Sequence, residues 1–337
     1  MNTREILGGK DFYLYAETAF AHEGSIAYLY QQIDAAAKSG VNGIKFQLLL
    51  EPQESYTQKV IENSKTFQWI FSETEWKRII EYAREKGLDV ILLPIDMESL
   101  KFCEENTALY EMLEVHSINF NHKYMLERIN SIPDKIVILG VGGRTLSDIQ
   151  YAIEKLMNVY LEKRILLMHG FQSFPTKLEN LKMHRIQGLK SFFGIDVGYA
   201  DHTSWEKDDT AIHQIAYVNG ARFFEKHLVL VQGEERTDYQ AGVDAEHLDK
   251  LKTALRQIKT IQDEENFWNL SESEQRYRNR EKRIVSTKAI QSGEIFTSEN
   301  LGYKVSQAEK KWEQKELEYI LGKVALKSIP EESVEVL

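Results

Sequence analysis

Eight short runs of aliphatic, aromatic and β-branched residues alternate with amphipathic helical segments between residues 12 and 262. The runs cover residues 12–20, 43–50, 89–96, 113–120, 135–143, 164–171, 196–202 and 221–230. Nearly continuous apolar strands that are each followed by a helix form parallel sheets with helices on their faces. Eight such units in about 250 residues favour closure of the sheet, so the sequence predicts an α/β protein with a (β/α)8 (TIM) barrel.

The alternation ends near residue 262, which predicts a second region. Residues 263–283 are polar and highly charged and predict an exposed linker with little helix. Residues 284–337 contain short β-like pieces separated by turn signals. We therefore predict a barrel domain over 1–262, a linker over 263–283 and a small β-rich domain over 284–337. A domain this small buries little surface, so we expect it to pack on something larger.

Composition excludes several classes of protein. The 337 residues carry a net charge of −10, and no basic stripe is present, so nucleic acid is not an expected partner. The chain has one cysteine, no run of 18 apolar residues and no apolar core of a signal peptide near its start. We expect a cytoplasmic protein without disulfides that does not bind membranes.

Polar residues gather where the predicted strands end. In a barrel of this kind the C-terminal ends of the strands carry the chemistry, so these residues are the candidate site. They are Glu17 after the first strand, Lys45 and Gln47 on the second, Ser117 and Asn119 after the fourth, Arg144 after the fifth, Gln172 after the sixth, Asp201 and His202 on the seventh, and Glu225, Lys226 and His227 on the eighth.

Two histidines on consecutive strands predict a metal site. His227 follows His202 by 25 residues, which is one β-α-β unit, so the two lie on neighbouring strands ~4.8 Å apart. Two imidazoles at that separation bind one divalent ion, and Asp201 and Glu225 lie beside them. Side chains alternate along a strand, so Glu225 and His227 share one face and Lys226 takes the other. The alternative is that one histidine caps a strand and the other faces the helices.

Lys45 and Glu17 complete the predicted chemistry. A lysine beside a metal suits an anionic substrate such as a phosphate or a carboxylate. A carboxylate such as Glu17 serves as a base or holds a metal-bound water. The structural alternatives are that Lys45 extends from a strand end towards water and that Glu17 is only its ionic partner.

Four segments and the C-terminal region resemble the sialic acid synthase family. "AETAFAHEGS" resembles the family's A-E-I-G-x-N-H-x-G-S, and "AAAKSGVNGIKFQ" resembles A-A-x-x-A-G-A-D-A-V-K-F-Q. "VGYADHT" is similar to V-G-Y-S-D-H-T, and "GARFFEKHLVL" is similar to G-A-x-x-I-E-K-H-F-T-L. The C-terminal "TKAIQSGEIFTSENLGYKV" resembles the antifreeze-like (SAF) domain of these synthases.

The resemblance implies condensation of phosphoenolpyruvate with an aldose to a 2-keto-3-deoxy, nonulosonic-type sugar acid. It implies a Mn²⁺-type ion, with Mg²⁺ or Co²⁺ as alternatives, held by His202 and His227. It also implies a domain-swapped homodimer in which the antifreeze-like domain covers the partner's barrel. Asp238 matches an aspartate of a family loop. The complete prediction is metal ligands His202 and His227, catalytic residues Glu17, Lys45, Asp201 and Glu225, and substrate-binding residues Gln47, Ser117, Asn119, Arg144, Gln172, Lys226 and Asp238.

The chain departs from the family pattern where the family binds phosphate and carboxylate. A family lysine is replaced by Glu114, a family acid by Asn119, and the serine before Asp-His-Thr by Ala200. A family arginine in the C-terminal domain is replaced by Val305. Each lost charge-assisted hydrogen bond is worth ~1.5–3 kcal/mol. Two alternatives therefore stay open: a metal-dependent aldolase or lyase that does not use phosphoenolpyruvate, and a non-catalytic barrel that binds a sugar or a protein.

Overall fold

The computed structural model describes residues 7, 11–171, 173–207, 209–262, 268–307 and 312–335. The chain divides into two compact units, Met1–Gln262 and Asp263–Leu337. Each unit is described by itself. No helix among the described residues is long and apolar enough to cross a membrane.

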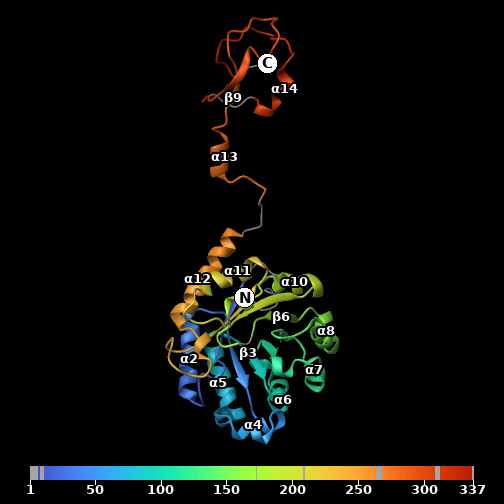
Figure 1. Cartoon of the computed structure of the whole chain (residues 1–337), viewed down its shortest axis with the longest axis vertical. Coiled ribbons are helices and arrows are strands. Elements are labelled where there is room, and N and C mark those ends of the chain that lie inside the picture. The colour runs from blue at the N-terminus through green and yellow to red at the C-terminus, as the bar shows by residue number, and fades with distance from the viewer. Residues whose placement is uncertain are drawn as a thin grey trace. The chain divides into compact units, whose positions relative to one another are not determined.

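The first unit is a closed parallel barrel, which confirms the predicted fold (Figure 1). Each strand pairs with the next in sequence, and β1 pairs with β8 to close the ring. The strands are β1 (Tyr13–Glu17), β2 (Gly43–Leu48), β3 (Asp89–Pro94), β4 (Met112–Val115), β5 (Ile136–Gly140), β6 (Ile165–His169), β7 (Asp196–Asp201) and β8 (Phe223–His227).

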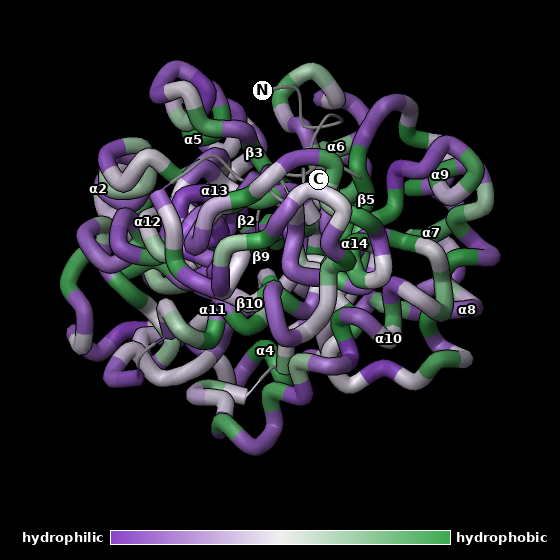
Figure 2. Tube along the Cα trace, turned by 90° about the horizontal axis from the view of Figure 1, so that it is seen from above, coloured by the Kyte–Doolittle hydropathy of each residue, from purple (hydrophilic) through white to green (hydrophobic). Residues whose placement is uncertain are grey.

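Helices surround the barrel, as Figure 1 shows. The long ones are α2 (Ile26–Ser39), α5 (Glu73–Glu85), α6 (Met97–Glu105), α7 (Lys123–Ile129), α8 (Leu146–Lys155), α10 (His184–Phe193), α11 (Asp209–Val218) and α12 (Ala245–Ile261). Short helices are α3 (Pro52–Ser55), α4 (Gln58–Glu62) and α9 (Met157–Leu161). Figure 2 shows hydrophilic and hydrophobic residues alternating along the helical turns, as expected for helices with one face on a sheet.

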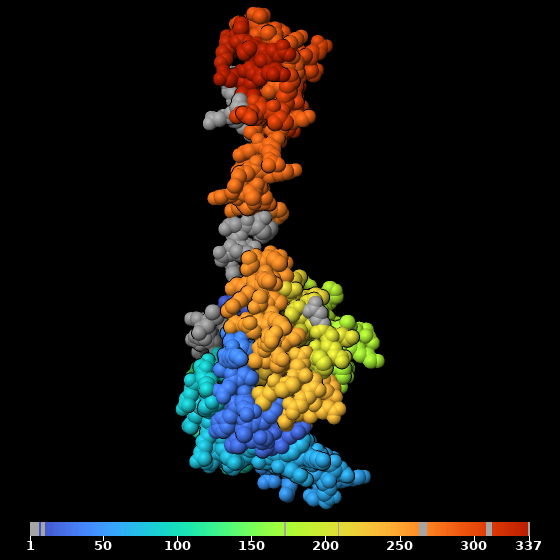
Figure 3. Space-filling view, turned by 90° about the vertical axis from the view of Figure 1, so that its left-hand side faces the viewer, coloured from blue at the N-terminus to red at the C-terminus, as the bar shows by residue number. Residues whose placement is uncertain are grey.

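Local sequence signals set the helix ends. The Ser25 hydroxyl caps α2 by accepting from the Tyr28 amide, and Gly40 ends α2 in the left-handed conformation at φ 68°. Thr145 and Asp148 form a capping box at the start of α8. Helices α2 and α12 lie side by side on the barrel surface (Figure 3), although they come from opposite ends of the unit's sequence.

Two apolar layers hold the barrel together. The larger core lies between strands and helices and includes Leu14 and Ala16 of β1. The smaller core includes Tyr13 and Tyr15, which alternate with those residues along the same strand and therefore face the barrel interior. The barrel interior is therefore packed with side chains.

The second unit is a small β-rich fold, as predicted. Strand β9 (Arg283–Ser286) pairs antiparallel with β10 (Leu301–Lys304), and helix α14 (Leu317–Ile320) packs nearby. Its own core is Ile284, Ile290, Phe296, Leu301, Ile320, Ala325 and Ile329. The segment predicted as a linker contains helix α13 (Glu272–Arg278), and residues 263–267 lie outside the described residues.

Candidate active site

A cavity of about 220 Å³ opens at the C-terminal ends of the barrel strands. Its described lining consists of Glu17, Lys45, Gln47, Leu93, Glu114, His116, Gly140, Gly142, Met168, Gly170, Phe174, Ala200, His202, Glu225, His227 and Asp238. The strand register explains the grouping, because Lys45 on β2 pairs with Glu17 on β1, and Glu17 pairs with His227 on β8. Neighbouring strands therefore deliver three of the predicted residues in one row.

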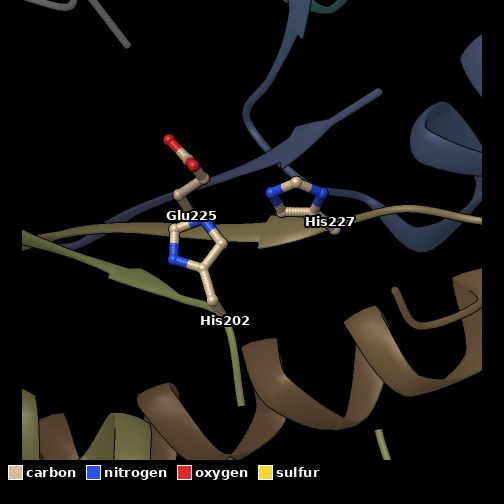
Figure 4. Close-up of side chains that lie close together, drawn as sticks. All are labelled: His202, Glu225 and His227. Carbon is tan, nitrogen blue, oxygen red and sulfur yellow. The ribbon is translucent and has the colours of Figure 1, made fainter. Parts of the chain in front are cut away.

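His202, Glu225 and His227 form a cluster with the composition of a metal site. One ligand atom from each residue lies within 4.8 Å of the others, and all three side chains are buried. Figure 4 shows the two imidazoles side by side, with His227 and Glu225 on β8 and His202 at the end of β7. The centroids of the two imidazole rings lie 5.0 Å apart. The chain therefore places two imidazoles and a carboxylate around one space.

Electrostatics suit this cluster to a divalent ion. Burial lowers the pKa of His202 to about 4 and holds the pKa of His227 well below its usual value, so both rings are neutral and offer lone pairs. Burial alone would raise the pKa of Glu225, but Lys45 and His202 outweigh it and lower that pKa. Nδ1 of His202 is buried and has no hydrogen-bond partner among the described residues. Two neutral imidazoles and an ionised carboxylate are a donor set that could hold a divalent metal ion.

Lys45 lies at the centre of three carboxylates. Its ammonium group is 2.7 Å from Glu114 Oε2 and 2.7 Å from Glu225 Oε2, and it also forms an ion pair with Glu17. Burial lowers the pKa of Lys45, but Glu114 and Glu225 reverse this effect and raise it above its ordinary value. Tyr15 donates a further hydrogen bond of 2.7 Å to Glu225. Lys45 is thus a fixed cation whose charge is already matched.

Glu114 is an active-site residue that the sequence analysis noted only as a departure from the family. Burial raises the pKa of its carboxyl group to about 7, although Lys45 opposes the rise. On the other side of Lys45, the Gln47 amide donates a hydrogen bond of 3.0 Å to Glu17. Glu17 and Glu114 therefore both compete with any anionic substrate for Lys45.

Asp238 is the remaining predicted residue that lines the cavity. It adopts the left-handed conformation at φ 63° immediately before a short 3-10 helix, Tyr239–Ala241. Burial raises the pKa of its carboxyl group. Seven predicted residues thus share one cavity: Glu17, Lys45, Gln47, His202, Glu225, His227 and Asp238.

Three predicted substrate-binding residues do not line this cavity. The Asn119 amide donates 2.8 Å to the backbone oxygen of Ile95, and Arg144 donates to the backbone oxygen of Ser117. Ser117 and Asn119 belong to the 3-10 turn Ser117–Asn119, which follows the end of β4 at Val115. Gln172 lies outside the described residues.

Asp201 and Lys226 require a correction, because neither lines the cavity. Each is fully buried, and the Lys226 ammonium lies 2.5 Å from Asp201 Oδ2. A further carboxylate, Asp209 at the start of α11, lies 3.3 Å from Lys226. Both side chains point to the helix side of the strands, since neighbouring residues on a strand face opposite ways. The structure therefore places Asp201 and Lys226 outside the cavity in which their catalytic and substrate-binding roles were predicted.

The cavity also contains residues that the prediction omitted. His116 follows β4, where a strand-end survey finds it, and burial lowers its pKa to about 4. Phe174 meets both predicted metal ligands edge-on, with ring centroids 4.9 Å from His202 and 5.5 Å from His227. No periodicity marks Phe174, because a loop carries it to this position. That loop is tied to β7 by a 2.7 Å bond from the Thr176 amide to the His202 backbone oxygen.

Comparisons with known proteins agree with this geometry. A model of the NeuB family matches residues 32–266. The chain is 27% identical to an N,N'-diacetyllegionaminic acid synthase of Campylobacter jejuni, over 95% of this chain and 97% of that protein. The structure of an N-acetylneuraminic acid synthetase from Leptospira borgpetersenii matches with a TM-score of 0.71 and 25% identity, over 80% of this chain and 93% of that one. A putative spore coat polysaccharide biosynthesis protein E from Chromobacterium violaceum shares the fold at a TM-score of 0.80 and 20% identity, over 96% and 97% of the two chains.

Proposed function

Because this chain belongs to the NeuB family, we propose that it is a metal-dependent synthase that condenses phosphoenolpyruvate with an aldehyde sugar. The product is a 2-keto-3-deoxy sugar acid of the nonulosonic type. The observation that carries the proposal is one cavity that holds a His202–Glu225–His227 cluster together with Glu17 and Lys45. The similarity to a legionaminic acid synthase over nearly the whole chain supports the same conclusion.

His202, His227 and Glu225 are the proposed ligands of a divalent ion, with Mn²⁺ favoured and Mg²⁺ or Co²⁺ as alternatives. Such an ion supplies Lewis acidity that polarises a carbonyl oxygen. Burial keeps both imidazoles neutral, so no proton has to leave the histidines before an ion binds. Phe174 lies edge-on to both rings and limits water on that side of the cluster.

The chain's other residues bind the substrates and move protons. In the proposed reaction the methylene carbon of phosphoenolpyruvate bonds to the aldehyde carbon, water adds to the enol carbon, and phosphate leaves. Glu17 is buried beside Lys45 and is the proposed acceptor of the proton from water. Lys45 is the proposed contact for an anionic group of phosphoenolpyruvate.

One observation favours a second function. Lys45 is the only lysine or arginine among the described residues that line the cavity, and it already contacts Glu114 and two other carboxylates. A phosphate with two negative charges gains little from a cation matched in this way. The second candidate is therefore a metal-dependent aldolase or lyase that acts on a carbonyl compound without phosphoenolpyruvate.

Calorimetry with phosphoenolpyruvate, with and without Mn²⁺, separates the two candidates. Micromolar binding that requires Mn²⁺, near −8 kcal/mol, supports the synthase. The double variant His202→Ala/His227→Ala is the control and should show no Mn²⁺-dependent binding of phosphoenolpyruvate. The second candidate replaces the first if two results are found with folded, Mn²⁺-loaded protein. The protein does not bind millimolar phosphoenolpyruvate, and it turns over a sugar acid without releasing phosphate.

We also propose that Asp263–Leu337 is an antifreeze-like domain of a domain-swapped homodimer. Supporting evidence is the exposure of two aliphatic side chains in this unit, 73% for Val305 and 86% for Leu326. Burial of these two side chains against a second chain would remove apolar surface from water. Light scattering after size exclusion should give twice the mass of one chain, and a single-chain mass would contradict the proposal.

A further inference from the structure

We propose that Asp201 and Lys226 act as a buried cross-strand ion pair that positions the metal ligands His202 and His227. The inference rests on the proposed metal site. It assigns a positioning role to two residues that the structure removes from the cavity.

The strand register supplies the first argument. Asp201 on β7 and Lys226 on β8 are direct partners across the two strands. His202 and His227 are the next residues along each chain, so each member of the ion pair adjoins one proposed ligand. A shift of either strand end relative to the other would change the separation of the two imidazoles. A bond between the preceding residues opposes that shift.

The hydrogen bonds of Asp201 supply the second argument. Its Oδ1 accepts from the Tyr199 hydroxyl at 2.8 Å and from the Thr203 amide at 3.1 Å. Its Oδ2 accepts from the Thr203 hydroxyl at 2.9 Å and from Lys226 Nζ at 2.5 Å. A carboxylate has about four acceptor positions, and these contacts fill them. Asp201 therefore has no capacity left for a substrate, and its orientation is fixed.

Lys226 joins this pair to the helix layer. Its ammonium group contacts Asp209 of α11 at 3.3 Å and the Thr203 backbone oxygen at 3.3 Å. Asp209 in turn lies 2.5 Å from Nε2 of His247 on α12. One network therefore connects β7, β8, α11 and α12 behind the two ligands. Outer partners that hydrogen-bond to metal ligands orient those ligands, whereas here the network acts on His202 and His227 through the backbone of the adjacent residues.

The energetics of buried ion pairs separate positioning from stability. Replacing both members by uncharged residues is often neutral for folding, whereas removing one leaves an unpaired buried charge and is strongly destabilising. A pair that serves only stability can thus be replaced without loss. A pair that fixes ligand geometry cannot, because the double replacement removes the link between the strands.

The test compares Asp201→Asn with the double variant Asp201→Asn/Lys226→Met. The measurements are Mn²⁺ affinity by calorimetry, the visible absorption spectrum of Co²⁺-loaded protein, and the midpoint of chemical unfolding. We expect both variants to bind Mn²⁺ about 10- to 100-fold more weakly than the wild type, with an altered Co²⁺ spectrum. We expect both variants to lose unfolding midpoint, because Lys226 keeps only Asp209 in the single variant and Asp209 loses Lys226 in the double variant.

Asp196→Asn is the matched control. Asp196 begins the same strand, β7, at the opposite end of the barrel, and its carboxylate lies 3.0 Å from Lys190. We expect this control to keep wild-type Mn²⁺ affinity and the wild-type Co²⁺ spectrum. If neither charge variant folds, Tyr199→Phe removes one hydrogen bond to Asp201 without changing any charge, and we expect it to weaken Mn²⁺ binding several-fold.

The outcomes are distinguishable from those of the proposed function. If the wild type binds no Mn²⁺ or Co²⁺, the proposed metal site itself is wrong. The positioning role is overturned if the wild type binds Mn²⁺ and the folded charge variants have the same Mn²⁺ affinity within twofold and the same Co²⁺ spectrum. If the charge variants do not fold, the same result for Tyr199→Phe overturns it.

Discussion

The most unusual residue environment in this molecule is that of Lys45, whose ammonium group contacts Glu17, Glu114 and Glu225. One positive charge cannot balance three buried carboxylates. A divalent ion on the His202–Glu225–His227 cluster would reduce the imbalance, and so would a proton on Glu114, whose pKa burial raises to about 7. The affinity of this cavity for an anion therefore depends on Glu114.

Glu114→Gln should strengthen phosphoenolpyruvate binding at pH 8 by at least about tenfold. The substitution removes a negative charge 2.7 Å from Lys45, and one such charge is worth a few kcal/mol at an effective dielectric constant of ~20. Calorimetry in the presence of Mn²⁺ measures the change. Glu104→Gln, which breaks an ion pair with Arg128 on the outer helices, is the matched control and should leave affinity unchanged. Weaker binding by Glu114→Gln would mean that Glu114 itself contacts the substrate.

His22 should make folding stability depend on pH. Burial lowers its pKa to about 4 in the folded chain, against 6.5 for an exposed histidine. Between pH 6.5 and pH 4 the unfolded chain therefore binds the extra proton, so stability falls as the pH falls, by up to about 3 kcal/mol. The loss begins near the unfolded pKa and is complete below the folded one.

Chemical unfolding of the wild type and His22→Asn, measured from pH 4 to pH 8, checks this effect. The asparagine amide oxygen can replace Nδ1, which accepts 3.1 Å from the Gly24 amide. Other buried histidines contribute equally to both proteins, so the difference between the two curves isolates His22. As the pH falls below 6.5, we expect the free energy of unfolding to fall more for the wild type than for His22→Asn. Parallel curves would contradict the prediction.

At the scale of the element, β7 has no room for a side chain at Gly198. A Cβ there would lie 2.8 Å from Met168 Sδ and 2.8 Å from the backbone oxygen of Phe223. Gly198→Ala should therefore cost about 1–3 kcal/mol of unfolding free energy, since overpacked cores must shift. Gly188→Ala in α10, where a Cβ meets nothing within 4 Å, is the control and should be neutral or stabilising by up to ~1 kcal/mol. Equal stabilities of the two variants would contradict the packing argument.

The sequence predicted the elements well because strand and helix periodicities persist over several residues. The eight strands and their parallel order follow from that rhythm. Period-two alternation already placed Lys226 on the face opposite His227, yet the substrate-binding prediction disregarded it. Ser117 and Asn119 were misplaced because β4 ends at Val115 and a 3-10 turn follows. Phe174 could not be predicted, because a loop path depends on contacts distant in sequence.

At the scale of the whole molecule, the two units have separate cores. The barrel core and the Ile284–Ile329 core of the second unit share no residue. We therefore expect calorimetry to show two unfolding transitions rather than one. A truncated chain of residues 1–262 should retain a cooperative barrel transition, at a midpoint lowered by the loss of any contact with the C-terminal unit of a partner. A single transition for the full chain, or an unfolded truncated chain, would show that the units fold together.

The wall of the cavity has two parts, one formed by β7, β8, β1 and β2 and the other by β3 to β6. In the resemblance to the sialic acid synthases, the row from His202 through His227 and Glu17 to Lys45 on β2 matches the family's residues, whereas Glu114 on β4 replaces a family lysine. Selection can therefore act on one arc of the wall while the other is held constant. Substitutions on β3 to β6 therefore leave the residues of the proposed metal site on β7 and β8 in place. Chimeras that carry the β3–β6 segment of a relative would show whether the substrate changes while the proposed metal site stays the same.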